Sequence, residues 1–183
     1  MKKIEIKEFG GPEVLEIKNV DIGKPGQNEV LVKNLSIGIN YIDTYHRSGL
    51  YPIPLPSGIG LEACSIIEEV GSEVKLFKVG DRVTRASMPI GTYSEKQIIP
   101  EDKLVKVPDN ISDEVASCIT LKGITAEYLL HRTYQVKKGD KILYHAAAGA
   151  LGQIFCPWAN ALGAEIIGTV GSDEKIEIAK KNG

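Results

Sequence analysis

Over residues 1–108, apolar and polar side chains alternate with a period of two, and turn residues interrupt the alternation. Successive side chains of a β-strand point to opposite faces, so this pattern predicts short, half-buried strands. Many short strands at close spacing predict a small all-β barrel or sandwich. The alternating segments are IEIKEFGGPEVLEIKNV, NEVLVKNLSIGIN, ACSIIEEVGSEV, DRVTRA, GTYSEKQIIP and DKLVKVP.

One stretch interrupts this pattern of strands. Residues 40–63, NYIDTYHRSGLYPIPLPSGIGLEA, open with a helical turn in our interpretation and then pass through three prolines. Long loops on a rigid β scaffold often carry ligand contacts, so we expect a binding segment here. The alternative is an irregular surface loop.

After Pro108 the apolar residues change to a helical spacing. Ser112 is a plausible N-cap, and two acidic residues follow it in the first turn. Gly123 is expected to divide the segment into two helices. We therefore predict one domain over residues 1–110 and a second over residues 111–183. The helically spaced residues are Val115, Cys118, Ile119, Ile124, Tyr128 and Leu129.

Residues 140–183 have the order strand, glycine loop, helix, strand and start of a second helix, which opens a doubly wound parallel sheet. Ala147, Gly149 and Gly152 form an AxGxxG variant of the dinucleotide-binding fingerprint. Glycine lets such a loop turn tightly and bring amide groups up to a pyrophosphate. The loop is predicted to bind a dinucleotide; the alternative is a plain strand-to-helix turn. The loop residues expected to touch the cofactor are Ala148, Gly149, Ala150, Leu151 and Gly152.

The end of the second strand of this unit bears on the choice between NAD and NADP. A carboxylate there would accept the ribose 2′-OH and repel a 2′-phosphate. The strand EIIGTV instead ends in Gly171 and Ser172, and Lys175 follows within about one helical turn. We therefore predict NADPH, with Gly171, Ser172 and Lys175 at its 2′-phosphate, although Asp173 lies beside them. Lys175 could equally be one more solvated charge on a helix.

Composition excludes several classes of partner. A formal net charge of -2 offers no basic surface for nucleic acid or an anionic membrane. No apolar run approaches the roughly 18 residues of a membrane span, and the start of the chain has no signal-peptide pattern. The cysteines Cys64, Cys118 and Cys156 are odd in number and far apart, which favours reduced thiols in a cytoplasmic protein.

Six motifs in order resemble the quinone oxidoreductase (zeta-crystallin-like) branch of the medium-chain dehydrogenase/reductase superfamily. They are GGPEVL, IGINYIDTYHRSGLYP, LPSGIGLEA, VGSEVKLFKVGDRV, LKGITAEYLL and HAAAGALG. The resemblance implies a mixed α/β chain in which a GroES-like β-barrel catalytic domain precedes the first part of a Rossmann domain. It also implies that NADPH lies in the cleft between the two.

The resemblance also implies a zinc-independent enzyme. Asn40 and Leu61 stand where zinc-dependent relatives have a cysteine and a histidine, and neither can replace those ligands. Zinc-free members reduce quinones or activated alkenes, so a quinone is the expected acceptor and an α,β-unsaturated carbonyl compound the alternative. Asn40, Tyr45 and Tyr51 are the candidate catalytic residues, the two tyrosines by stacking on the acceptor or by hydrogen bonding to it. Tyr41, Ile42, Asp43 and Thr125 are expected to border the nicotinamide.

Two departures from this branch bear on activity. Relatives run on for well over a hundred residues, so we expect a C-terminally truncated chain without the rest of the parallel sheet and without the strand edge through which full-length relatives form homodimers. Pro157 falls inside the helix after the loop, where it costs roughly 3 kcal/mol, and Ala150 replaces a common glycine. A third hypothesis is therefore a non-catalytic remnant, or a fragment that needs a second chain.

Overall fold

The computed structural model describes residues 1–183, which form two compact units, Met1–Thr120 and Leu121–Gly183. The division falls inside one helix, later in the chain than the predicted boundary between residues 110 and 111, and the limits of the two domains stay a prediction. No helix of the structure is long and apolar enough to cross a membrane.

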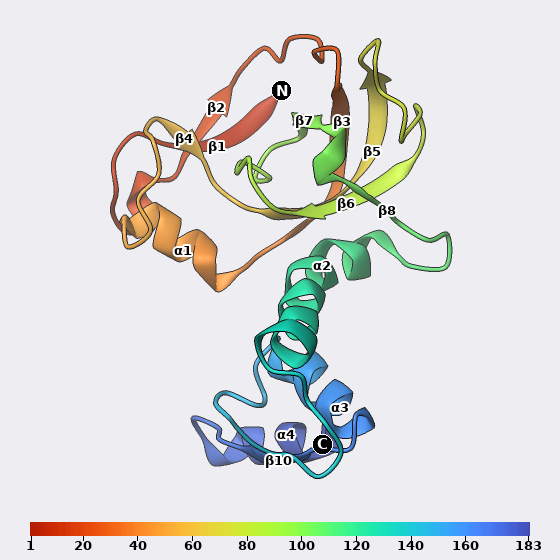
Figure 1. The fold of residues 1–183 in the computed structure, drawn as a ribbon. Coiled ribbons are helices and arrows are strands. Elements are labelled where there is room, and N and C mark those ends of the chain that lie inside the picture. Colours follow the sequence, from red (N-terminus) through yellow and green to blue (C-terminus); the bar gives the residue numbers. More distant parts are fainter. The chain divides into compact units, whose positions relative to one another are not determined.

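The first unit is built from two antiparallel sheets (Figure 1). A five-stranded sheet has the order β7-β3-β5-β6-β8, and a three-stranded sheet has the order β2-β1-β4. This arrangement confirms the prediction of short strands joined by turns. The strands are β1 (Lys2–Ile6), β2 (Glu16–Asn19), β3 (Glu29–Gly38), β4 (Ser57–Gly58), β5 (Glu62–Val70), β6 (Arg82–Ala86), β7 (Lys96–Pro100) and β8 (Val105–Lys106), and single 3-10 turns lie at Pro12–Val14 (η1) and Glu101–Lys103 (η2).

The core of this unit forms between the central strands of the larger sheet. Its fully buried residues come mainly from β3, β5, β6 and β7, as the alternating pattern requires. Long antiparallel pairings hold β3 between β5 and β7. The buried cluster consists of Val30, Val32, Ile67, Val83, Ile99 and Leu104.

The predicted helical turn after Asn40 is the helix α1 (Tyr41–Ser48). The backbone amide of Asn40 donates to the Asp43 carboxylate at 2.9 Å, which satisfies one of the amides at this helix start. The helix ends at Gly49, whose φ of 81° lies in the left-handed region that favours glycine. α1 therefore begins and ends with local signals that the sequence carries.

The helix α2 (Asp113–Tyr128) is continuous, and the predicted division at Gly123 is wrong. The Ser112 hydroxyl accepts a hydrogen bond from the Val115 amide at 3.3 Å, so the predicted N-cap is confirmed. Gly123 keeps both its backbone N–H and its C=O, so it lowers helix stability by about 1 kcal/mol without breaking the helix. A π-helical turn, η3 (Leu129–Thr133), follows directly.

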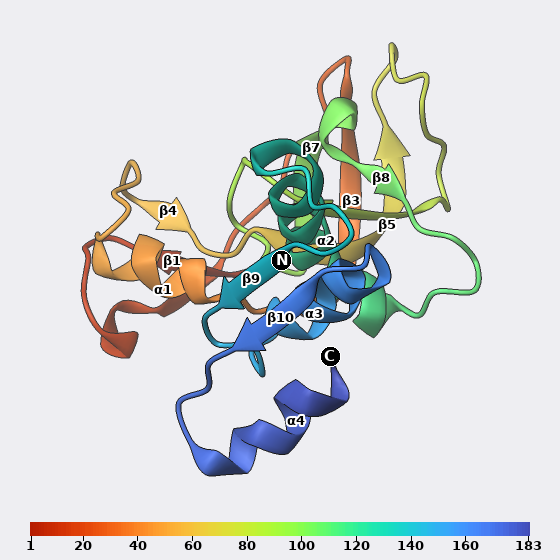
Figure 2. The same cartoon turned by 60° about the horizontal axis from the view of Figure 1, so that its bottom comes forward.

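The second unit contains the predicted βαβ arrangement. β9 (Lys141–Tyr144) pairs in parallel with β10 (Glu165–Gly168), and α3 (Gly152–Ala161) connects them (Figure 2). A 3-10 turn η4 (Asp173–Lys175) and the helix α4 (Ile176–Lys181) follow β10. Pro157 lies inside α3 without ending it, because its ring is on the exposed side of the helix.

Candidate functional site

Three tyrosines form a contiguous cluster on α1 and the loop after it. The ring centroids of Tyr41 and Tyr45 lie 5.3 Å apart, and those of Tyr45 and Tyr51 lie 5.2 Å apart, both pairs edge to face. The Tyr51 amide donates to the Tyr45 carbonyl at 3.2 Å, which folds the loop back onto the helix. Tyr41 is 76% exposed and Tyr51 is 49% exposed, so the cluster presents aromatic surface to solvent.

A buried polar network lies at the start of α1. The Asn40 side-chain amide donates to Glu62 Oε2 at 2.9 Å, and the Tyr93 hydroxyl donates to Asp43 Oδ2 at 2.9 Å. Asn40, Asp43 and Glu62 are all buried. The network fixes the first turn of α1 against β5 and the loop before β7.

Burial raises the pKa of the Asp43 carboxyl, because desolvation disfavours its charged form. The hydrogen bonds from the Asn40 backbone and Tyr93 and the nearby His46 act in the opposite direction, whereas the charge of Glu62 adds to the increase. Burial also raises the pKa of Tyr93 well above its ordinary value. The phenol of Tyr93 is therefore a donor to Asp43 throughout the neutral pH range.

The structure brings most of the predicted residues of the first unit together. Asn40, Tyr41, Asp43 and Tyr45 share the first turns of α1, with Ile42 beside them, and Tyr51 packs on Tyr45. Thr125 belongs to the second unit, where its hydroxyl donates to the Leu121 carbonyl at 2.7 Å. Its approach to the nicotinamide stays a prediction.

Two members of this site were not predicted as functional residues. Glu62 and Tyr93 are 22 and 50 residues from their partners Asn40 and Asp43. Glu62 follows Leu61 in the segment compared with zinc ligands, and Tyr93 stands in an ordinary strand-like segment. The carboxylate of Glu62 between the apolar residues Leu61 and Ala63 was the one available signal.

The glycine loop of the second unit connects β9 to α3 and is hydrogen-bonded to the residue that follows β10. The Ala147 amide donates to the Thr169 carbonyl at 3.0 Å, and His145 Nδ1 lies 3.0 Å from Thr169 Oγ1. Ala146 has a φ of 59°, a left-handed conformation that alanine rarely adopts. Backbone strain of this kind concentrates at functional loops.

Backbone amides at the start of α3 are available to a ligand. The amides of Ala150, Leu151 and Gly152 donate to no backbone acceptor, as expected for the first residues of a helix. A Cβ on Gly152 would collide with the Ala147 carbonyl, so only glycine lets the helix start this close to the strand. Unpaired amides on a helix N-terminus suit an anionic group such as a pyrophosphate.

The residues predicted for the 2′-phosphate also lie close together. Gly171 and Ser172 follow β10, and the Lys175 amide donates to the Ser172 carbonyl at 3.1 Å in the turn η4. Gly171, Ser172 and Lys175 are exposed, as is Asp173 between them. A hydroxyl and an ammonium group are thus both accessible at the end of the second strand.

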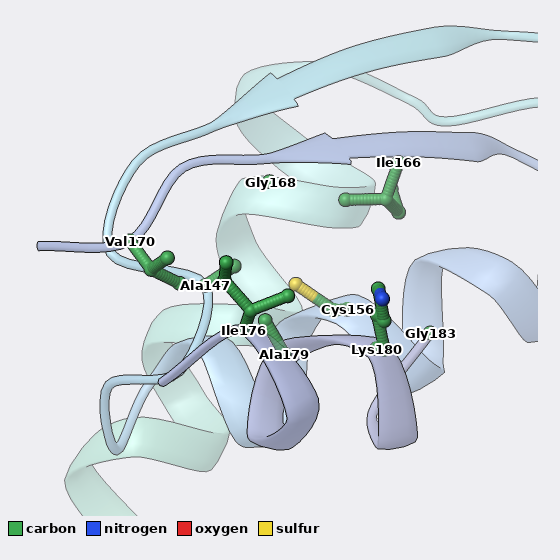
Figure 3. Close-up of a pocket in the computed structure, with 9 residues that line it drawn as sticks. All are labelled: Ala147, Cys156, Ile166, Gly168, Val170, Ile176, Ala179, Lys180 and Gly183. Carbon is green, nitrogen blue, oxygen red and sulfur yellow. The ribbon is translucent and has the colours of Figure 1, made fainter. Parts of the chain in front are cut away.

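A cavity of about 410 Å³ lies under β10, between this strand and the helices α3 and α4 (Figure 3). Ile166 from β10, Cys156 from α3 and Ala179 from α4 line it, together with Ala147. Burial raises the pKa of the Cys156 thiol, which makes it a poor nucleophile. The lining is mostly apolar, with Lys180 as its one charged side chain, so the exposed part of the neighbouring glycine loop is the better candidate site for a charged cofactor.

No group of three or more His, Cys, Asp or Glu side chains is placed to hold a metal ion. Asn40 donates its side-chain amide to Glu62, so its position is occupied by a hydrogen-bonding group rather than a thiolate. The chemistry of this donor set does not fit a catalytic zinc ion.

Comparisons with known proteins identify similar chains. Residues 26–109 match the alcohol dehydrogenase GroES-like domain family. The whole chain is 52% identical to a quinone oxidoreductase of Pseudomonas aeruginosa, of which it covers 56%. It is 46% identical, over 97% of its length, to a 2-haloacrylate reductase of Burkholderia sp., of which it covers 55%.

A solved structure gives the same picture for the fold. The chain superimposes in full on the crystal structure of Escherichia coli quinone oxidoreductase complexed with NADPH, with a TM-score of 0.97 and 50% identity, and covers 56% of that chain. The chain therefore spans little more than half the length of these relatives. The fold is mixed α/β, with a GroES-like domain followed by the start of a Rossmann-like region, as predicted.

Proposed function

Since the chain belongs to the quinone oxidoreductase branch of the medium-chain dehydrogenase/reductase superfamily, we propose that it serves zinc-independent, NADPH-dependent reduction of quinones. The observation that carries the proposal is the loop from Ala147 to Gly152, with unpaired amides at the start of α3 and a glycine at which a Cβ would collide with the Ala147 carbonyl. The cofactor complex of the Escherichia coli relative supports the choice of NADPH.

In this proposal the second unit binds the phosphates of the cofactor. The amides of Ala150, Leu151 and Gly152 hold the pyrophosphate, and Ala148 and Gly149 shape the loop around it. At the 2′-phosphate, Gly171 lets the backbone approach closely, Ser172 donates its hydroxyl and Lys175 donates its ammonium group. A carboxylate at residue 172 would instead favour NADH.

The first unit supplies the acceptor site. A quinone is a flat electrophile, and Tyr45 and Tyr51 offer aromatic ring surface and two phenol donors to its carbonyl oxygens. Asn40, Tyr41, Ile42 and Asp43 border the nicotinamide, with Thr125 from the second unit. When bound, the reduced nicotinamide supplies a hydride, so the protein has mainly to align donor and acceptor and to exclude water.

The first experiment is a titration of the 183-residue chain with NADPH and with NADH, followed by nicotinamide fluorescence. We expect saturable binding that prefers NADPH. The substitution S172D should weaken NADPH binding by about tenfold, a change of about 1.4 kcal/mol, and spare NADH. K175A should weaken NADPH binding alone, whereas K181A on the same segment is the matched control. Equal affinities for both cofactors, or none, would contradict the assignment of the cofactor.

The similarity to a 2-haloacrylate reductase favours one second candidate, reduction of an activated alkene. Such an acceptor has a carbonyl or carboxylate oxygen for a tyrosine donor but no ring to stack. Turnover of matched quinone and enone panels with Y45F, Y51F and Y51A separates the two. Loss of activity only in Y51A favours stacking and a quinone, whereas equal losses in Y51F and Y51A favour a hydrogen-bonded enone.

A further inference from the structure

Two buried side chains on α1 each have a polar atom without a partner among the protein's atoms. They are Asp43 Oδ1 and His46 Nδ1, and the residues are 4% and 7% exposed. Buried polar atoms are nearly always hydrogen-bonded, because an unpaired one costs about 1–3 kcal/mol. Two such atoms on one short helix therefore need a common explanation.

The two atoms are chemically complementary, and their residues lie on the same face of α1. Asp43 and His46 are three residues apart on the helix, which places their side chains on the same face. A carboxylate oxygen only accepts hydrogen bonds, and an imidazole nitrogen that carries a proton donates one. A hydrogen-bonded link between them requires only a small side-chain movement or one bridging water molecule. The other groups around Asp43 are already assigned, since Tyr93 and the Asn40 amide both donate to Oδ2.

His46 also contacts the tyrosine cluster. Its ring centroid lies 6.5 Å from that of Tyr51, with the two planes tilted by 59°. Tyr51 in turn packs on Tyr45 at 5.2 Å and is held to the Tyr45 carbonyl through its amide. His46 thus packs against Tyr51 on one side and lies beside the buried network at Asp43 on the other.

We propose that His46 is a positioning residue for the acceptor site: its imidazole carries a proton on Nδ1, shares it with Asp43 Oδ1, and by this link fixes the Tyr51 ring against Tyr45. The inference rests on the proposed binding of a quinone by the two tyrosines. His46 acts through Tyr51 and does not touch the acceptor itself. The link connects the fixed start of α1 to the exposed loop at its other end.

The first test reads the tautomer of His46 and needs no turnover. Long-range proton–nitrogen correlation spectra of the 15N-labelled chain distinguish an imidazole protonated on Nδ1 from one protonated on Nε2. H46N identifies the signals, and His131, an exposed histidine against Trp158, serves as the internal reference. We expect the Nδ1–H form for His46. The Nε2–H form would overturn the proposal.

The second test uses a matched pair of substitutions. The amide of asparagine in H46N sits close to the place of Nδ1, and that of glutamine in H46Q close to the place of Nε2. Tetramethyl-1,4-benzoquinone, which has no open ring position for attack by a thiol, is titrated against each chain while the Tyr51 ring resonance is followed. We expect H46N to bind within about twofold of the parent chain and H46Q and D43N to bind at least about fivefold more weakly, with H131N unchanged.

The outcomes separate the two proposals. Equal binding by H46N and H46Q would exclude a role for the Nδ1 link. If the parent chain binds no quinone, the proposed acceptor site fails, but the Tyr51 resonance still reports on the link. In that case a shifted Tyr51 resonance in H46Q but not in H46N supports the positioning role, and identical spectra overturn it. Urea unfolding of each variant identifies any chain that has simply lost its fold.

Discussion

The backbone carbonyl oxygen of Ala147 occupies the space in which a Cβ atom of residue 152 would lie. The substitution G152A must therefore push α3 away from β9 or distort the loop between them. We expect it to lower the free energy of unfolding by about 1–3 kcal/mol, the usual cost of overpacking. Urea unfolding measures the loss, and NADPH titration measures the accompanying loss of affinity.

The matched control is G123A in α2. A Cβ at this position meets nothing within 4 Å, and the residue lies in the helix interior. Alanine there should raise the free energy of unfolding by about 0.5–1 kcal/mol. If both alanine substitutions changed stability equally, the contact with Ala147 would not be the reason that residue 152 is glycine.

Ala146 is expected to gain from replacement by glycine. Its φ of 59° costs alanine about 1–2 kcal/mol, and glycine adopts this conformation without that cost but adds entropy to the unfolded chain. The net expectation for A146G is a stabilisation of up to about 1 kcal/mol. A148G, at a neighbouring residue outside the left-handed region, should instead lose about 0.4–1 kcal/mol. Thermal unfolding of the two variants decides between these signs.

The three thiols should differ in reactivity. Cys118 is exposed, whereas burial and a hydrogen bond to Asp113 raise the pKa of Cys64 to about 11, and burial raises that of Cys156. Because the thiolate is the reactive form, we expect Ellman's reagent at pH 8 to label one thiol rapidly in the folded chain and all three after unfolding. C118S should abolish the rapid phase. A rapid phase that survives this substitution would contradict the burial of the other two thiols.

Asp81 gives the chain a defined acid sensitivity. Its carboxylate accepts from the Lys78 amide at 3.0 Å and from Lys106 Nζ at 3.0 Å, and these bonds lower its pKa below the ordinary value, with the backbone bond as the larger cause. A lowered pKa means that the folded state binds the proton less tightly than the unfolded state. The stabilisation is therefore present above the ordinary aspartate pKa of about 3.9 and is lost as the pH falls through the lowered value. D81N should be less stable than the parent chain by about 1 kcal/mol at pH 7, with the difference disappearing in acid.

Local signals in the sequence were enough for much of the fold. Ser112 identified the start of α2, and the turn from β9 through Gly152 into α3 followed from the glycine spacing. The wrong prediction, a helix break at Gly123, overestimated how strongly one glycine interrupts a helix. One glycine inside α2 weakens a helix without ending it, and Pro157 is tolerated because it removes a single hydrogen bond on an exposed face.

The residues of the candidate site fall into two groups, those that a local sequence pattern could indicate and those that it could not. The segment from Asn40 to Tyr51 could be assigned because its residues are close in sequence. Tyr93 and Glu62 could not, since their contacts close loops of 50 and 22 residues that no local pattern encodes. The buried position of Asp43 was equally inaccessible, because it depends on strands that come later in the chain.

The single tryptophan of the chain gives the second compact unit an optical reporter that the first unit lacks. Trp158 lies on α3, with its ring 5.5 Å from that of His131. Tyrosines occur in both units, so tyrosine signals do not separate them. Selective excitation of the indole therefore follows the unfolding of the second unit without a contribution from the first.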